Sequence, residues 1–265
     1  MTRVLSALVL LPVVIGTIWF LPPAGTLVLA AVAGVLACSE YRNLARALQI
    51  EVPLGIAATA VVLVCSSMWL SWSSPNVTSV VLLAVLVVTG AISVAGRPHQ
   101  GALADAAATV FAPIYLGLPL GALAAIRAES SGGGRLPLLL LLVVIVVSDS
   151  AQYYSGRAFG RRPLSPAISP KKTVEGAIGG VVFGTLATVV GGHYLFHAPI
   201  WILILFGVAL SLLGIIGDLF ESLLKRSAGV KDSSNLIPGH GGVLDRIDSW
   251  LFAAPVYYVF VRFIA

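Results

Sequence analysis

Long apolar runs, separated by short polar stretches, follow one another along the whole chain. Each is close to the length of about 20 residues that a helix needs to cross the hydrocarbon of a bilayer. Helices are expected because they satisfy their own backbone hydrogen bonds in lipid, and the short alternating strands of a barrel are missing. We place nine spans, at residues 4–21, 26–41, 53–72, 77–95, 104–126, 136–154, 174–195, 199–222 and 247–264.

Prolines occur within the fifth span and directly after the first apolar run. Pro113 and Pro119 interrupt the fifth span, which makes it the weakest of the nine. The first apolar run is followed by Leu21-Pro22-Pro23, not by the small residues of a cleavage site. We therefore expect a retained first span and not a secretory signal.

Composition agrees with a membrane protein. Hydrophobic residues make up 58% of the chain, charged residues 10%, and the mean hydropathy is +1.00, whereas a soluble domain carries about 25% charged residues. Cys38 and Cys65 lie in apolar stretches without the spacing of a disulfide framework or a zinc site. We expect an all-α, polytopic integral membrane protein with about nine transmembrane helices, folded as one domain over 1–265.

The cations fix an orientation for these spans. If the N-terminus is cytoplasmic, the outer side receives three of the 16 Lys and Arg residues, Arg127, Arg135 and Arg262. The inner side receives Arg3, Arg42, Arg46, Arg97, Arg157, Arg161, Arg162, Lys171, Lys172, Lys225, Arg226, Lys231 and Arg246. Because cytoplasmic loops carry the excess of Lys and Arg, we expect the N-terminus inside and the C-terminus outside.

The net charge of +5 gathers in two inner loops, 155–173 and 223–246. These cations could serve only as topology determinants and anchors for anionic headgroups. The second loop, however, also holds His240 and the glycine-rich run Pro238 to Gly242. Such a run lets the backbone approach a ligand closely, and its consecutive N–H groups can bind an anion.

Three carboxylates flank this second loop. Asp218 lies near the inner end of the eighth span, about 27 Å across the bilayer by helical rise, while Asp245 and Asp248 stand three residues apart where the ninth begins. Acidic residues at membrane depth face a cavity or a partner. Oxygen ligands beside phosphate-binding cations suit Mg²⁺. The alternative is that Asp218 and Asp245 form ion pairs with Lys225 and Arg246 that only close the helix ends.

The first loop has a similar character. Asp149 lies inside the sixth span, where an aspartate either has a function or pairs with a neighbouring span. Thr173 or Ser169 can cap the seventh span, with Glu175 favourable in its first turn. Capping does not explain Lys171 and Lys172, because cations are not favoured at a helix N-terminus; they indicate a bound phosphate.

Together these residues resemble a known signature, that of the phosphatidate cytidylyltransferases. Its positions are filled here by Ser222, Lys225, Arg226, Lys231, Asp232, Pro238, His240, Gly241, Gly242, Asp245, Arg246 and Asp248. The upstream stretch is also similar, through Asp149, Tyr153, Gly156, Phe159, Gly160, Ser169, Pro170, Lys172, Thr173, Glu175 and Gly176. Gln152 departs from the pattern, where a small residue is expected. The resemblance covers 136–265, the expected catalytic half, and is only topological over the N-terminal helices of 1–135.

The resemblance implies an enzyme that transfers a cytidylyl group from CTP to phosphatidic acid, giving CDP-diacylglycerol and pyrophosphate. It implies Mg²⁺, alone or with a second cation, on Asp218 and Asp245, with Asp248 close by. The expected phosphate-binding cations are Lys225, Arg226, Lys231 and Arg246, and the opposite wall of the cavity would be Lys172, Ser169 and Asp149. The expected substrate-binding residues also include Ser222, Asp232, His240, Gly241, Gly242, Tyr153, Thr173 and Glu175.

The location that follows is the inner cell membrane, multi-pass, with the site facing the cytoplasm, because CTP is cytoplasmic and phosphatidic acid lies in the inner leaflet. Membrane lipid is the expected surrounding partner, nucleic acid is not expected, and a homodimer is left open. A CTP-dependent polyprenol or phytol kinase would need the same cations and metal. An anionic-solute transporter would place charges near the midplane and contain repeats, which this chain lacks.

Overall fold

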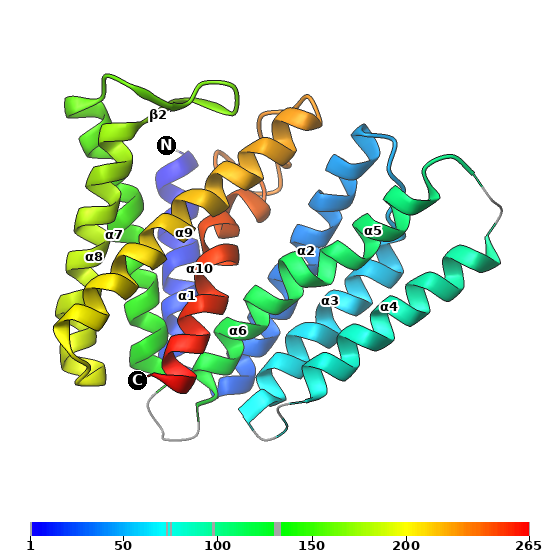
Figure 1. Ribbon diagram of the computed structural model, residues 1–265, viewed down its shortest axis with the longest axis horizontal. Helices are drawn as coiled ribbons and strands as arrows, with labels where there is room; N and C mark the ends of the chain where they lie inside the picture. Colours follow the sequence, from blue (N-terminus) through cyan, green and yellow to red (C-terminus); the bar gives the residue numbers. More distant parts are fainter. Residues whose placement is uncertain (1, 73, 75, 97–98, 130–133, 265) are drawn as a thin grey trace.

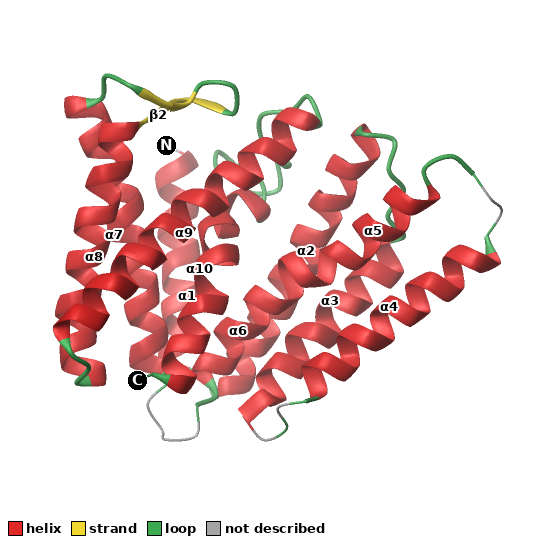
Figure 2. Cartoon of the chain, in the orientation of Figure 1, coloured by secondary structure: helices red, strands yellow, loops and turns green. Residues whose placement is uncertain are grey.

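The computed structural model describes residues 2–72, 74, 76–96, 99–129 and 134–264, and is helical apart from one antiparallel hairpin (Figures 1 and 2). The first half consists of α1 (Thr2–Phe20), α2 (Pro23–Ala47), α3 (Leu54–Trp69), η1 (Leu70–Trp72), α4 (Val77–Ala95), α5 (Ala102–Ala112), η2 (Pro113–Gly117) and α6 (Leu118–Arg127). The second half consists of α7 (Arg135–Phe159), β1 (Pro163–Ser165), β2 (Ser169–Thr173), α8 (Val174–Phe196), α9 (Ile200–Ser227) and α10 (Leu244–Phe263).

A helical segment lies at each position where the sequence predicts a span. Within the described residues, six segments are long and apolar enough to cross a membrane: α2, α4, the continuous segment from α5 to α6, α7, α8 and α9. Two further apolar helices, Leu8–Phe20 and Leu54–Trp69, are shorter. The class of a helical, multi-pass membrane protein is therefore supported, whereas the number nine stays a prediction.

The span that the prolines interrupt is one continuous segment in the structure. α5 ends at Ala112, the five residues of η2 form a π-helical turn, and α6 follows directly. Pro113 has no N–H to donate to the preceding turn, and the wider π turn accommodates this loss without ending the helix. Tyr115 and Leu116 in this turn are buried.

The structure corrects some of the expected boundaries. α2 continues to Ala47 and α9 to Ser227, past the predicted ends at residues 41 and 222. Helical hydrogen bonds do not depend on lipid, so a helix can continue beyond the end of its apolar run. Part of the expected loop 155–173 forms the hairpin of β1 and β2, in which Ser165 pairs with Ser169, so the fold contains a small sheet beside its helices.

With α5 to α6 taken as one segment, consecutive long helices run in alternating directions, so that the two termini lie at opposite ends of the bundle (Figure 1). The α2–α3 connection, the hairpin and the loop between α9 and α10 all lie at the same end as the N-terminus. This end is the one to which the sequence assigns most cations. Arg97, one of those cations, lies outside the described residues, as does the side chain of Arg3.

Two buried clusters form the core, and α10 contributes to both. One cluster contains Leu141, Leu203 and Tyr257, and the other contains Leu116 and Leu244. α10 packs on α9, α6, α7 and α2. The first turn of α10 is therefore held from several sides, and the candidate site is built around it.

Candidate active site

One group of charged side chains comes together from four elements, and we call it the outer cluster. It consists of Asp149 of α7, Lys172 of β2, Asp218 of α9, and Arg246 and Asp248 of α10. The three carboxylates are close enough for their charges to interact. Lys172 forms an ion pair with Asp218. Its positive charge also interacts with the carboxylates of Asp149 and Asp248.

Close contact between α9 and α10 brings two of these carboxylates together. A Cβ atom built on Gly217 would stand 2.5 Å from the carbonyl oxygen of Asp248, so only glycine permits this crossing. Asp218 follows directly in the sequence, and its side chain remains 30% exposed. Asp248 accepts a hydrogen bond of 2.7 Å from the backbone N–H of Ser249. The cluster has three carboxylates against two cations, an excess of negative charge that suits a metal cation.

A second group has less exposed charged side chains, and we call it the inner network. It consists of Glu40 of α2, Glu221 and Lys225 of α9, Ser233 of the loop, and Asp245 of α10. The Nζ atom of Lys225 lies 2.6 Å from Oδ1 of Asp245 and forms a second ion pair with Glu221. All three charged side chains are largely buried, at 11%, 5% and 0% exposed. The ammonium group therefore faces carboxylates and not open space.

Asp245 has its second oxygen occupied as well. Oδ2 accepts hydrogen bonds from the backbone N–H of Ser233 at 2.9 Å, the hydroxyl of Ser233 at 2.7 Å and the backbone N–H of Gly242 at 2.8 Å. The sequence predicts a metal on Asp245, with an ion pair to Lys225 as the alternative. In the structure Asp245 forms the ion pair with Lys225, and its role as a metal ligand stays a prediction.

Glu40 joins this network from the first half of the chain, and sequence reasoning missed it. Its carboxylate accepts hydrogen bonds from the hydroxyls of Ser233 and Ser234 and from the backbone N–H groups of Val243 and Leu244, at 2.7–3.0 Å. Glu221 was missed as well. The signal was present for both, since each is an acidic residue within a predicted apolar span.

The loop between α9 and α10 carries the other signature positions. Lys231 and Asp232 are exposed, His240 is half-buried, and the N–H of Ile237 donates to the carbonyl of Gly241 at 2.8 Å. Gly242 is required by packing, because a Cβ there would meet the Ser233 hydroxyl and the Glu40 carboxylate. The loop thus packs on the inner network, while the side chain of Lys231 is exposed.

Arg226 joins this loop to the hairpin. Its Nε donates to the carbonyl of Ile168 at 3.2 Å, and its Nη1 donates to the carbonyl of Val230 at 3.1 Å. The Arg226 side chain is exposed, and the nearby Ser222 is half-buried on α9. Arg226 is therefore placed beside both loops, in a position open to a ligand.

The hairpin and the start of α8 agree with the sequence interpretation. The hydroxyl of Thr173 accepts a hydrogen bond from the N–H of Gly176 at 3.1 Å, which confirms the predicted cap. Glu175 accepts from the backbone N–H groups of Arg161 and Arg162 and so holds the hairpin against α8. Two further predicted residues are placed less specifically: Ser169 is half-buried in β2, and Tyr153 is exposed on α7 beside Tyr154.

The outer cluster fits a hard cation by its donor chemistry. In the described part of the chain, no three His, Cys, Asp or Glu residues are arranged to hold a metal by themselves. Mg²⁺, however, is usually held by one or two carboxylates together with substrate phosphates. Asp218 and Asp248 are a pair of carboxylates of this kind, and Lys172 and Arg246 belong to the same cluster.

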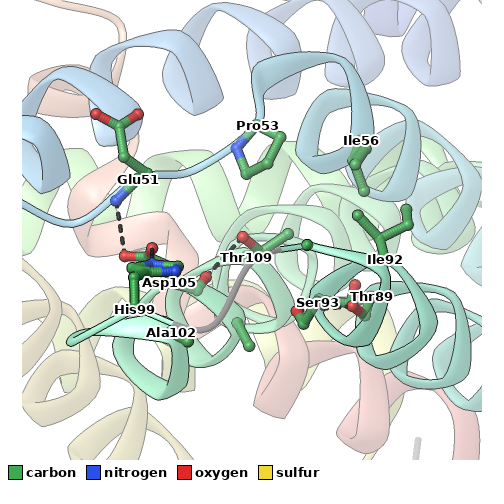
Figure 3. Close-up of a pocket in the computed structure, with 12 residues that line it drawn as sticks. Glu51, Pro53, Ile56, Thr89, Ile92, Ser93, His99, Ala102, Asp105 and Thr109 are labelled. Atoms are coloured by element: carbon green, nitrogen blue, oxygen red, sulfur yellow. Dashed lines mark hydrogen bonds and ion pairs between the residues drawn. The ribbon is translucent and has the colours of Figure 1, made fainter.

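A separate pocket of about 240 Å³ lies between α3, α4 and α5 (Figure 3). His99 and Asp105 face each other across 2.8 Å at one side, and Thr89 and Ile92 line the other. None of the residues that the sequence predicts for the site lines this pocket. The candidate active site is therefore the outer cluster together with the adjoining inner network.

Comparisons with known proteins show which proteins this chain resembles. A phosphatidate cytidylyltransferase of Synechocystis is 50% identical over 116 residues, which cover 43% of this chain and 39% of the relative. One of Bacillus subtilis is 49% identical over 112 residues, 42% of each chain. An uncharacterized Escherichia coli protein, YnbB, is 45% identical over 116 residues, 44% of this chain and 39% of the relative.

These matched segments span about two fifths of the length of the relatives. The match to a family extends much further along the chain. Residues 1–264, which include the helices of the first half, match the Cytidylyltransferase family. The chain is a member of the Cytidylyltransferase family.

Proposed function

We propose that the protein transfers a cytidylyl group from CTP to phosphatidic acid, giving CDP-diacylglycerol and pyrophosphate. The observation that carries the proposal is the convergence of Asp149, Asp218 and Asp248 with Lys172 and Arg246 at one end of the bundle. Membership of the family and the names of two relatives support it. Carboxylates for a metal beside cations for phosphates are what nucleotidyl transfer requires.

In the proposed reaction, a phosphate oxygen of phosphatidic acid attacks the α-phosphorus of CTP. The new phosphorus–oxygen bond forms as the bond between the α-phosphorus and its bridging oxygen breaks. The electron pair leaves with pyrophosphate. The phosphate monoester loses its second proton with a pKa of about 6, so near neutral pH the attacking group needs no general base.

Asp218 and Asp248 would hold Mg²⁺ together with CTP phosphates. When bound, the metal would supply charge neutralisation for the departing pyrophosphate. Asp149 lies close to both carboxylates and would be a ligand for a second cation. Asp245 would act indirectly, because its oxygens hold Lys225 and the loop.

The cations would bind the two anionic substrates. Lys172 and Arg246 belong to the outer cluster, and Arg226, at the end of α9, and Lys231, in the loop that follows, are exposed. Together they would orient the lipid phosphate and the triphosphate of CTP and raise the local concentration of both. Ser169, Ser222 and His240 would line the same space from the hairpin, α9 and the loop.

We also propose that all nine apolar helices cross the inner cell membrane, with the site facing the cytoplasm. The thirteen inner cations and the alternating helix directions support this orientation. A cysteine introduced at Ser165 should react with an impermeant thiol reagent from the cytoplasmic face only. One at His197, in the exposed α8–α9 connection, should react from outside only. The reverse pattern would disprove the orientation.

The reaction itself is tested with purified protein in detergent and labelled CTP. Label in the α-phosphate should enter the lipid in the presence of phosphatidic acid and Mg²⁺, with release of pyrophosphate. Label in the γ-phosphate should stay in the released pyrophosphate. Transfer of the γ-label to a lipid alcohol with release of CDP would show a lipid kinase instead.

A further inference from the structure

Glu40 of α2 forms side-chain hydrogen bonds to the loop between α9 and α10 and to the first residue of α10. Oε1 accepts from the Ser234 hydroxyl at 2.7 Å and the Val243 N–H at 2.9 Å. Oε2 accepts from the Ser233 hydroxyl at 3.0 Å and the Leu244 N–H at 2.7 Å. These partners lie 193–204 residues further along the chain.

The environment of this carboxylate differs from that of an ordinary buried acid. Glu40 is 2% exposed, and none of the ion pairs among the described residues includes it. Its charge is balanced by hydrogen-bond donors and by the N-terminus of α10, where N–H groups and the helix dipole favour an anion. A buried charge without these donors would be strongly unfavourable, so the contacts must be kept.

The contacts fix the part of α10 that carries the site. Val243 and Leu244 begin the helix, and Asp248 follows four residues after Leu244, about 6 Å along the axis. Arg246 lies between them. A shift of the first turn would therefore move both residues relative to Asp218, which belongs to a different helix.

The same contacts reach Lys225 through a shared hydroxyl. Ser233 Oγ lies 3.0 Å from Glu40 Oε2 and 2.7 Å from Asp245 Oδ2, and its single proton serves one of them at a time. Asp245 in turn holds Lys225. The α2 helix is thus linked to α9 and α10, two of the helices that carry the outer cluster.

We infer that Glu40 is a positioning residue of the active site, through which the N-terminal half sets the place of Arg246 and Asp248 for cytidylyl transfer. Glu40 does not touch the substrate. It acts through the loop and the first turn of α10. The expected effect on kcat rests on the proposed function. The fixing of the loop by Glu40 is independent of that function.

Glu40→Gln is the sharpest variant, because it keeps the size of the side chain. The amide would place an N–H group against the donors that now face a carboxylate oxygen. We expect kcat to fall about ten- to a hundredfold, the loss that follows a misplacement of about 1 Å. The KM for CTP should change less than about threefold, because the exposed cations that bind phosphates remain. Glu40→Asp, which keeps the charge, should recover part of kcat.

The matched control is Glu51→Gln. Glu51 is also a carboxylate of the first half at the same end of the bundle, but its side chain is 70% exposed and pairs weakly with Arg46. This variant should keep the wild-type kcat. A loss of kcat as large as that of Glu40→Gln would show a general effect of charge and would overturn the inference.

A second measurement is independent of activity. Lys231 is exposed in the loop that Glu40 holds, so limited trypsin digestion should cleave after Lys231 faster in Glu40→Gln than in the wild type or in Glu51→Gln. Ser234→Ala removes one donor from the loop side and should change cleavage and kcat in the same direction, by about threefold. If Glu40→Gln does not fold, cleavage and kcat of Ser234→Ala test the inference in its place.

The outcomes separate this inference from the proposed function. If the wild type makes no CDP-diacylglycerol, the proposed function fails, while faster cleavage in Glu40→Gln would still support the fixing of the loop. If the wild type is active and the Glu40 and Ser234 variants match it in kcat and in cleavage, the inference is wrong. A lower melting temperature with unchanged kcat would show a purely structural residue and would also overturn it.

Discussion

The outer cluster and the inner network both combine carboxylates with cations at the same end of the bundle, yet their surroundings differ. In the inner network, the oxygens of Asp245 and Glu40 face several protein donors each. In the outer cluster, Asp218 has an ion pair with Lys172 and remains 30% exposed. A carboxylate that accepts several hydrogen bonds from the protein has less capacity left for a ligand, whereas exposed oxygens can accept a metal or orient a substrate.

The comparison also explains why acidic residues of one signature have different tasks. Asp245 and Asp248 lie three residues apart on α10 and point into neighbouring but different surroundings. One holds the loop and Lys225, and the other faces Asp218 and Asp149. Two aspartates that stand close together in the signature therefore differ in role, since one holds the fold and the other belongs to the chemical site.

The largest effect is expected for the outer cluster. Asp218→Asn and Asp248→Asn each replace a carboxylate by a neutral amide, a poor ligand for a hard cation. Loss of the metal's contribution should reduce kcat about a thousandfold or more. Stability should change by less than about 1 kcal/mol for Asp218→Asn, because its side chain is partly exposed. Steady-state kinetics and melting in detergent check both, and near-normal turnover at saturating Mg²⁺ would remove either residue from the metal site.

A different result is expected for the inner network. Asp245→Asn leaves Lys225 with one buried partner and should lower the free energy of unfolding by about 3–5 kcal/mol. Asp232→Asn, an exposed change in the same loop, should stay within about 0.5 kcal/mol of the wild type. Chemical unfolding in detergent measures both variants. If Asp245→Asn instead purifies with full stability and no activity, Asp245 belongs with the metal ligands and the division between the two groups is wrong.

A smaller effect is expected where the loop packs on the inner network. Gly242→Ala puts a methyl group against the Ser233 hydroxyl and the Glu40 carboxylate and should cost about 1–3 kcal/mol of stability. Gly55→Ala is the matched control, because nothing lies within 4 Å of its added Cβ. Melting temperatures compare the two. Equal melting would show that the loop is not tightly packed on Glu40.

Much of the fold and part of the site could be predicted from the sequence. Apolar length and periodicity placed a helix at every expected span, and the cap at Thr173 followed from local chemistry. The hairpin was missed, because a short strand pair among polar residues has no strong pattern. The sequence indicated Lys172 for the opposite wall of the cavity, but its ion pair with Asp218 could not be identified from spacing.

The sequence by itself determined the helical membrane architecture, the family and the set of residue types at the site, because apolar run length and a dense signature are local properties of the chain. Only the tertiary structure decided which carboxylates are open and which are enclosed. Asp245 and Asp248 are equivalent in a helical pattern, and Glu40 lies about 190 residues before its partners. Their roles depend on which donors from other helices surround each oxygen, and this is fixed by packing in three dimensions.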